Sequence, residues 1–228
     1  MTLMDWSPLE LPHEPASFLY AIPEREGRLF VQETCLASRQ PVPFSLLAQR
    51  LELRISRLQL NSTLRLGVEH CVIPMGSGLP LRAQQVLPFG AAAGFIHPAT
   101  GYQLTRSLRA APLIAAAIQA SLPQGRQAAV DRALEVMWPT ECRNQFALYQ
   151  MGLEIILGMS PAQLRSFMTR FFRLPTPLWL GFMEGSLPTR DIASAMWRVF
   201  THSPTSLRLQ LLQHGALSGS RALISAIA

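Results

Sequence analysis

Two adjacent residues, Gln32 and Glu33, carry the polar chemistry of an otherwise β-like stretch, RLFVQETCLASR at residues 28–39. Side chains alternate along a strand, so Glu33 falls in an apolar row. That row also holds Leu29, Val31 and Cys35. One interpretation is an edge-strand glutamate that faces water. The other is a carboxylic acid in an apolar pocket, where desolvation raises its pKa and keeps it protonated. Such an acid can protonate an unactivated double bond if water is excluded.

A second candidate site is the small-residue stretch GAAAGFIHPATGY at residues 90–102. Small residues let the backbone approach a flat ligand, and a helix that opens at Thr100–Gly101 offers free amide groups. The pattern therefore suits a flavin ring. The alternative is a tight strand-to-helix turn in which His97 is a loop histidine that hydrogen-bonds the backbone. The residues in question are Gly90, Gly94, His97, Pro98, Thr100, Gly101 and Tyr102.

Other motifs that could carry chemistry are missing. The stretch PMGSGLPL lacks the third glycine of a dinucleotide fingerprint and has no helix after it, so it predicts no phosphate loop. The remaining histidines and the three cysteines fit no metal spacing, and no metal is expected. We interpret Cys35, Cys71 and Cys142 as buried thiols in a reducing compartment.

Composition narrows the class of protein. Of the 228 residues, 49% are hydrophobic and 15% charged, which excludes a disordered chain. All 20 basic residues are arginine, and the net charge of +6 comes from residues 101–228. A basic, apolar half suits an anionic membrane surface better than nucleic acid, for which no motif is present. No secretory leader and no transmembrane helix are expected.

The first hundred residues predict a mixed α/β region. Residues 16–23 and 28–37 read as a hairpin across the turn-like EREG, and residues 69–75 and 84–94 as two further strands. Residues 42–60 follow the spacing of a helix, with Ser45 as its cap.

From residue 100 onward the chain predicts helices. The first covers residues 100–122 and places Leu104, Leu108, Ala111 and Ala115 on one apolar face. A second begins at Ser160, with Pro161 as its first residue and Gln163 completing a capping box. A third runs from Ser203 to Gly215. Short helices interrupted by proline are typical of a helical cap or of segments in a membrane interface.

Several of these stretches, taken together, resemble one family. FLYAIP, RLFVQETCLAS, CVIPMGSGLP, GAAAGFIHPATGYQLTRSLRAAP, MWPTECRNQ and FFRLPTPLWLGFMEGSL occur in the order found in plant-type and cyanobacterial lycopene cyclases. The resemblance extends from about Leu3 to about Gly215. It implies a flavoprotein that uses reduced FAD, with NADPH as reductant, to close the ends of linear lycopene into β- or ε-rings. An acid starts this non-redox reaction by protonating the terminal double bond. Electrostatics and aromatic faces then stabilise the cation.

The resemblance also implies the roles of individual residues. The family's strand motif is close to Phe-Leu-Glu-Glu-Thr; here Glu33 keeps the second acid, and Gln32 replaces the first. If the first glutamate is the family's proton donor, this chain has lost it. The turn motif is intact, so Gly90, Gly94, His97, Pro98, Thr100, Gly101 and Tyr102 take the flavin-binding role.

The implied fold class is α/β, the substrate-binding part of a FAD/NAD(P)-binding Rossmann-type flavoprotein with a mixed sheet, followed by a mainly helical C-terminal region. We expect residues 1–95 to form a β-rich substrate part with the last flavin-domain strands. Residues 96–125 form the flavin-contacting turn and helix, and residues 126–228 a membrane-associated helical cap. The family's amino-terminal flavin-binding segment has no counterpart here. The expected location is a peripheral one, at the cytoplasmic or thylakoid membrane of a photosynthetic bacterium.

Two hypotheses follow. The chain is either the carboxy-terminal portion of a cyclase, inactive without its flavin-binding segment, or a non-catalytic remnant that binds carotenoid or membrane. A basic nucleic-acid module is a third, disfavoured hypothesis, because it predicts salt-sensitive RNA or DNA binding without a motif to support it.

Overall fold

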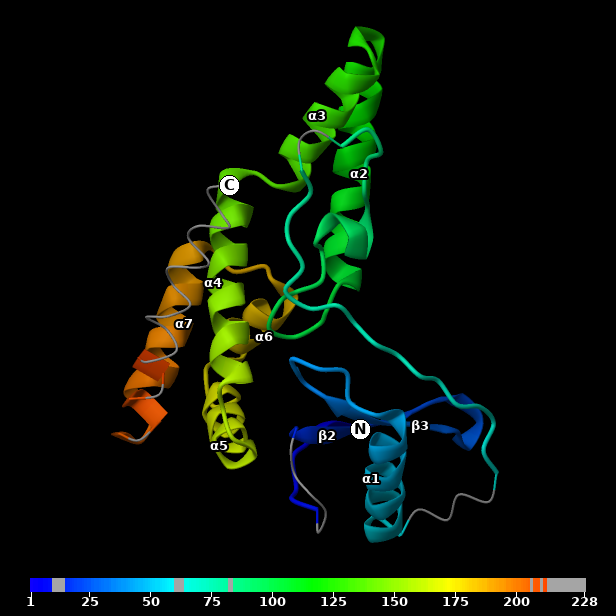
Figure 1. Cartoon of the computed structure of the whole chain (residues 1–228), viewed down its shortest axis with the longest axis vertical. Coiled ribbons are helices and arrows are strands. Elements are labelled where there is room, and N and C mark those ends of the chain that lie inside the picture. The colour runs from blue at the N-terminus through cyan, green and yellow to red at the C-terminus, as the bar shows by residue number, and fades with distance from the viewer. Residues whose placement is uncertain (10–14, 60–63, 82–83, 206, 210, 213–228) are drawn as a thin grey trace. The chain divides into compact units, whose positions relative to one another are not determined.

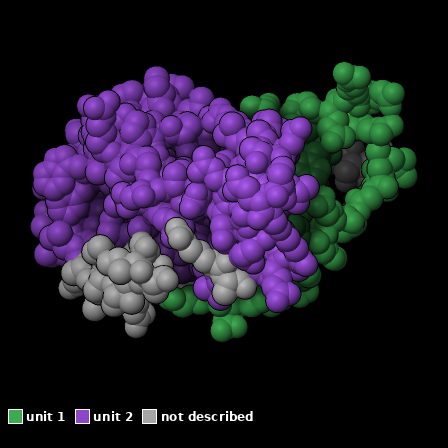
Figure 2. All heavy atoms as spheres, turned by 90° about the horizontal axis from the view of Figure 1, so that it is seen from above, with its two compact units in different colours: residues 1–73, 159–166 green, residues 74–158, 167–228 purple. Residues whose placement is uncertain are grey.

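The computed structural model describes the chain except for residues 10–14, 60–63, 82–83, 206, 210 and 213–228. The chain divides into two compact units, coloured separately in Figure 2. The first unit contains residues 1–73 and 159–166, and the second contains residues 74–158 and 167–228.

The first unit contains a three-stranded antiparallel sheet of β1 (Thr2–Asp5), β2 (Ser17–Pro23) and β3 (Leu29–Cys35), in that order. The predicted hairpin is confirmed, and its turn includes the short 3-10 helix Arg25–Gly27. Within this register Leu19 pairs with Glu33 and Tyr20 with Gln32. Because side chains alternate, Gln32 and Glu33 lie on opposite faces of the sheet.

The helix α1 (Phe44–Arg57) packs against β2 and β3 (Figure 1). The helix was predicted correctly, but its cap was not. Pro43 precedes the first turn, and no side chain caps it, so Ser45 does not serve. The buried side chains of this helix are Arg50 and Arg54, while its leucines are half-buried or exposed. A polar side of α1 therefore faces the sheet.

The two strands predicted at residues 69–75 and 84–94 are not formed. Residues 64–81 and 84–89 contain no strand, so the sheet is antiparallel rather than mixed. A strand is stable only when a neighbour satisfies its amide and carbonyl groups, and the described residues supply no neighbour here. Residues 90–93 form a 3-10 turn instead. The apolar side chains of the unpaired segment are exposed, among them Leu64, Leu66, Val68, Val72 and Ile73.

The second unit is helical, as predicted for the later part of the chain. α2 (Leu104–Ser121) and α3 (Arg126–Met137) form an antiparallel hairpin (Figure 1). α7 (Thr189–Thr201) packs against α4 (Thr140–Leu157) and α6 (Thr176–Glu184). α5 (Pro161–Phe171) belongs partly to each unit. Residues 205, 207–209 and 211–212 are also helical, and the predicted end at Gly215 lies outside the described residues.

Helix α2 differs from its prediction in start and orientation. It begins at Leu104, not at Thr100. It buries Ile114 and Ala117 in its contact with α3, in a core that also holds Phe95 and Trp138. The stripe predicted to be its inner face is exposed, namely Leu104, Leu108, Ala111 and Ala115. The helix is apolar on more than one side, so periodicity alone did not identify the side that packs.

The start of α5 follows the predicted capping box. The Ser160 amide donates to Gln163 Oε1 at 2.8 Å, and the Gln163 amide donates to Ser160 Oγ at 3.4 Å. One cysteine prediction was wrong, because Cys71 is exposed, while Cys35 and Cys142 are half-buried. Among the described helices, none combines the length and the hydropathy needed to cross a bilayer.

Candidate active site

Glu33 is buried in an ion pair. Its side chain is 1% exposed, and Oε2 accepts a hydrogen bond from Arg54 Nε at 2.7 Å. Its Oε1 accepts from Ser17 Oγ at 2.6 Å. A carboxyl group that accepts at both oxygens, once from a guanidinium, has the partners of an ionised carboxylate. The surroundings of Glu33 thus match neither interpretation, since it faces neither water nor an apolar pocket, while its catalytic role stays a prediction.

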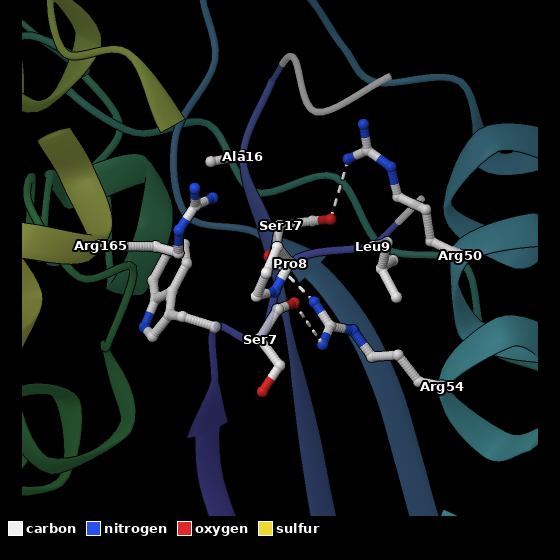
Figure 3. Close-up of a pocket in the computed structure, with 9 residues that line it drawn as sticks. Ser7, Pro8, Leu9, Ala16, Ser17, Arg50, Arg54 and Arg165 are labelled. Atoms are coloured by element: carbon white, nitrogen blue, oxygen red, sulfur yellow. Dashed lines mark hydrogen bonds between the residues drawn. The ribbon is translucent and has the colours of Figure 1, made fainter. Parts of the chain in front are cut away.

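Two arginines of α1 extend this network to the backbone before β2. Arg54 also donates to the carbonyl oxygens of Ser7 and Ser17, at 3.1 and 3.3 Å. Arg50 donates through Nη1 to the Pro15 carbonyl oxygen and to Ser17 Oγ, both at 2.8 Å. Figure 3 shows both guanidinium groups reaching from α1 toward Ser7 and Ser17, where they line a small pocket. Burial lowers the pKa of Arg50, and the nearby Glu33 charge opposes that shift. This arrangement holds the amino-terminal segment against α1.

Gln32 lies on the other face of the sheet, away from α1. Its cross-strand partner is Tyr20, and on this face the neighbouring pairs are Phe18 with Thr34 and Ile22 with Phe30. The Phe18 and Tyr20 rings meet edge to face, with centroids 4.9 Å apart. A side chain at position 32 therefore faces aromatic and apolar groups, whereas Glu33 faces arginines.

Five of the residues predicted to contact a flavin lie in one closed loop: His97, Pro98, Thr100, Gly101 and Tyr102. The His97 amide donates to the Tyr102 carbonyl oxygen at 2.8 Å, and the Gly101 amide donates to the His97 carbonyl oxygen at 2.9 Å. Thr100 Oγ1 donates to the Met183 carbonyl oxygen at 3.4 Å. Pro98 is fully buried, and Gly101 has φ +76°, a conformation that favours glycine.

The turn around Gly90 and Gly94 lies beside the start of α2. Both glycines have positive φ, +62° and +74°. A Cβ on Gly90 would come within 2.9 Å of Gln103 Nε2, the end of a flexible side chain, so the positive φ rather than the space favours glycine here. Trp138 Nε1 donates to the Ala93 carbonyl oxygen at 2.8 Å and so holds the turn in place. The sequence thus identified two turns that the fold brings together.

His97 is held as a neutral imidazole. Its Nδ1 accepts from the Ala99 amide at 3.2 Å, so the proton is assigned to Nε2, which is buried and bonds to no described residue. Burial lowers the pKa of His97 to about 3, and the positive charge of Arg106 adds to that shift. The bond to Ala99 is that of a backbone-bonded loop histidine, and contact of His97 with a flavin stays a prediction.

Sequence reasoning missed the partners on which both sites depend. Arg54 was given no role, although Arg50, Arg54 and Arg57 recur at the spacing of one helix face. In the second unit, Arg106 stacks on Trp138, with 3.9 Å between the guanidinium carbon and the ring centroid. No local signal in the sequence pointed to Trp138, because it lies far along the chain from the turn that it supports.

The second site fits a flat aromatic group better than a metal. Ala91 and Ala92 are exposed, Tyr102 is 41% exposed, and the nearest atom to a Cβ on Gly101 would be Met75 Sδ at 3.8 Å. These small side chains leave open surface beside an aromatic ring. Nowhere in the described part of the chain do three or more histidine, cysteine or acidic side chains come together as metal ligands would.

Comparison with known proteins decides the family. A family model described as "Lycopene cyclase protein" matches residues 1–209. The chain belongs to the lycopene cyclase family. It is 35% identical over 219 residues to a lycopene beta cyclase of Synechococcus elongatus. This alignment covers 92% of this chain and 53% of that relative. It is 32% identical to the lycopene beta cyclase of Capsicum annuum, over 95% of this chain and 46% of the relative.

The family includes relatives with another name. The capsanthin/capsorubin synthase of Citrus sinensis is 31% identical, over 93% of this chain and 45% of its own length. The chain therefore spans about half the length of the curated cyclases it matches. No solved structure matches it.

Proposed function

We propose that this chain is the carboxy-terminal part of a FAD-dependent lycopene cyclase in carotenoid biosynthesis. The whole enzyme would close the ends of linear lycopene, or of another linear carotene, into β- or ε-rings without net redox change. The observation that carries the proposal is the closed loop of residues 97–102 beside the Gly90–Gly94 turn. It gives the family's turn motif a rigid, small-residue surface that suits a flavin ring.

The residues of this chain would position the ring and the substrate. Gly101, Tyr102 and the backbone of the turn would hold the flavin, which, when reduced by NADPH, supplies an electron-rich surface beside the carotene end. On the sheet, the half-buried Tyr20 ring opposite Gln32 would offer an aromatic contact that stabilises positive charge, with the buried Phe18 ring packed against it. Binding and orientation are then the tasks of the described residues.

The position of the acid follows from the two faces of β3. Glu33 is committed to Arg54 and Ser17, and to act as a proton donor it would first have to be protonated, which would deprive the Arg54 charge of this partner. Position 32 faces aromatic groups, where an acid would be desolvated and able to protonate a double bond. In this chain that position holds Gln32. Glu33 is kept as the alternative donor because its carboxylate is the one that remains.

Exposed apolar side chains support the proposal that a flavin-binding segment packs against this chain. The unpaired stretch 64–73 exposes a row of leucine, valine and isoleucine side chains, and α2 exposes Leu104 and Leu108. Each of these exposed apolar stretches, taken by itself, is a candidate interaction site. A FAD-binding segment, on the same polypeptide or on another, would cover them.

The test is reconstitution. The chain is co-expressed with the amino-terminal half of the Synechococcus elongatus relative and purified, and bound FAD is measured by absorbance. Ring formation from lycopene with NADPH is then followed by chromatography. We expect the complex to retain FAD and the chain alone to retain none. Stoichiometric FAD on the chain alone, or none on the complex, would contradict the proposal.

A second function is favoured by one observation. The only carboxylate of the strand pair, Glu33, is ion-paired, and Gln32 cannot donate a proton at useful pH. This arrangement also suits a non-catalytic remnant that binds carotenoid or membrane. A reconstituted complex that holds FAD and binds lycopene but forms no ring would favour the remnant.

We also propose that the chain associates peripherally with a cytoplasmic or thylakoid membrane of a photosynthetic bacterium. At the end of α5, Phe171 contacts Phe182, and Phe172, the next residue, contacts Trp179, so these rings pack within the protein. The exposed Trp197 of α7, with Arg198 beside it, is a better candidate. Tryptophan and arginine together suit the interface of an anionic bilayer.

A further inference from the structure

Arg106 is a half-buried cation without an anionic partner. Its guanidinium carbon lies 3.9 Å from the Trp138 ring centroid and 4.9 Å from that of Phe95. It makes no hydrogen bond or ion pair to any described residue. Every Asp and Glu side chain of the second unit is described: Asp131, Glu135, Glu141, Glu154, Glu184 and Asp191.

Three other arginines of the same unit have a hydrogen-bond or ion-pair partner. Arg109, three residues further along α2, lies 3.7 Å from Glu184, and Arg126 donates to the Gln85 carbonyl oxygen at 2.7 Å. Arg143 donates to the Trp138 carbonyl oxygen at 2.8 Å. A buried charge is costly unless it is paired and hydrogen-bonded, and aromatic rings return only part of that cost. The nitrogen atoms of Arg106 are not among the fully buried atoms without a partner, so its N–H donors stay accessible to water or to an acceptor from outside the described protein.

The location of Arg106 indicates which acceptor. The Trp138 ring that it covers is the one that donates to the Ala93 carbonyl oxygen and holds the Gly90–Gly94 turn. Arg106 follows the closed loop of residues 97–102 by four residues. Its positive charge helps to lower the pKa of the buried His97. It also interacts electrostatically with Tyr149, whose buried hydroxyl has no hydrogen-bond partner among the described residues. The unpaired guanidinium thus belongs to the surface assigned to the flavin ring.

We propose that Arg106 is a ligand-binding residue whose guanidinium donates to the electron-rich pyrimidine edge of the flavin ring. The inference rests on the proposed function and goes further, because it assigns a charge to one edge of the cofactor. A planar fork of donors matches the nitrogen and carbonyl acceptors of that edge. Positive charge there tunes the electronics of the flavin and favours its electron-rich form.

Sulfite binding tests this charge without measuring turnover. The sulfite lone pair forms a bond from sulfur to flavin N5, and the resulting negative charge is delocalised onto the pyrimidine edge. Positive charge at that edge therefore tightens sulfite binding. In the reconstituted, FAD-loaded complex we expect Arg106→Gln to weaken sulfite binding roughly tenfold or more, measured by loss of flavin absorbance. Arg106→Lys should retain much of the affinity.

Arg109→Gln is the matched control, because Arg109 is an exposed arginine on the same helix with its own acidic neighbour. Its sulfite affinity should equal that of the wild type. Equal affinity in Arg106→Gln and wild type would overturn the proposal.

A melting experiment on the chain alone separates binding from a purely structural role. Arg106→Met keeps an apolar stem over Trp138 and removes the charge. If Arg106 is present for a ligand, the melting temperature should stay the same or rise, because an unpaired, half-buried cation is gone. A fall of several degrees would show that stacking on Trp138 is its main task and would overturn the proposal. If the reconstituted wild-type complex retains no flavin, that result contradicts the proposed function. The melting comparison alone would then decide the role of Arg106.

Discussion

At the scale of single residues, adjacent positions on one strand have opposite surroundings. Glu33 lies with the arginines of α1, and Gln32 lies with aromatic rings. A one-residue step along a strand exchanges a charged environment for an apolar one. If position 32 is the place of the proton donor, as proposed, the acid of the reaction and the acid that stabilises the fold would be different side chains.

The ion pair of Glu33 should be structural. Glu33→Gln and Arg54→Gln should each destabilise the chain by about 3–5 kcal/mol, because each leaves a buried group without its partner. The double variant should lose less than the sum of the two, as measured by urea unfolding. Glu26→Gln is the control, since the Glu26–Arg28 pair is exposed, and should cost less than about 1 kcal/mol. Additive losses in the double variant would argue against the pair.

Restoring an acid at position 32 should restore proton donation. In the reconstituted complex, Gln32→Glu is expected to raise ring formation by about 10²-fold or more, the usual contribution of a general acid. Gln32→Asn keeps an amide and should give no gain. No change in Gln32→Glu, together with loss of activity in a correctly folded Glu33→Gln variant, would assign the proton to Glu33.

His97 should make stability depend on pH. The folded protein holds it neutral, with a pKa of about 3, whereas the unfolded chain protonates it near pH 6.5. Between these values the unfolded state binds the extra proton, so stability falls as pH falls below about 6.5, with a slope of up to about 1.4 kcal/mol per pH unit. His97→Gln should flatten this slope between pH 7.5 and 5.5 in urea titrations.

At the scale of elements, local signals predicted what local contacts decide. The hairpin of β2 and β3 and the start of α5 depend on residues close in sequence, and both formed as predicted. The strands at residues 69–75 and 84–94 depend on a neighbour that sequence periodicity cannot supply, and they did not form. The closed loop of residues 97–102 lies within a stretch that the sequence analysis identified. The roles of Arg54, Trp138 and Arg106 were not predicted. Their contacts join distant parts of the chain or depend on which face of a helix packs.

The two predicted caps allow a direct comparison. Ser160→Ala should cost about 1 kcal/mol, because it removes one bond of the capping box at α5. Ser45→Ala, at a cap that the structure does not use, should be neutral within a few tenths of a kcal/mol. Chemical denaturation of both variants measures the difference, and equal losses would contradict the assigned caps.

At the scale of the whole molecule, the excess charge and exposed apolar groups predict membrane association. The chain should float with anionic liposomes, and Trp197→Ala should reduce the bound fraction several-fold, because Trp197 is 64% exposed. Trp179→Ala is a control, since Trp179 is half-buried against Phe172. A chain that stays in the soluble fraction with anionic liposomes would remove this proposal.

The exposed, unpaired segment 64–73 has a practical consequence for labelling chemistry. It contains Cys71, an exposed thiol, whereas burial raises the pKa of Cys35 to about 11 and also raises that of Cys142. Alkylation reagents react with thiolates that they can reach, so a maleimide dye at neutral pH will attach first at Cys71. Any partner that covers this segment will slow that reaction. Cys71 therefore reports on this segment, and mass spectrometry of the maleimide adduct can follow the docking of a partner without an engineered cysteine.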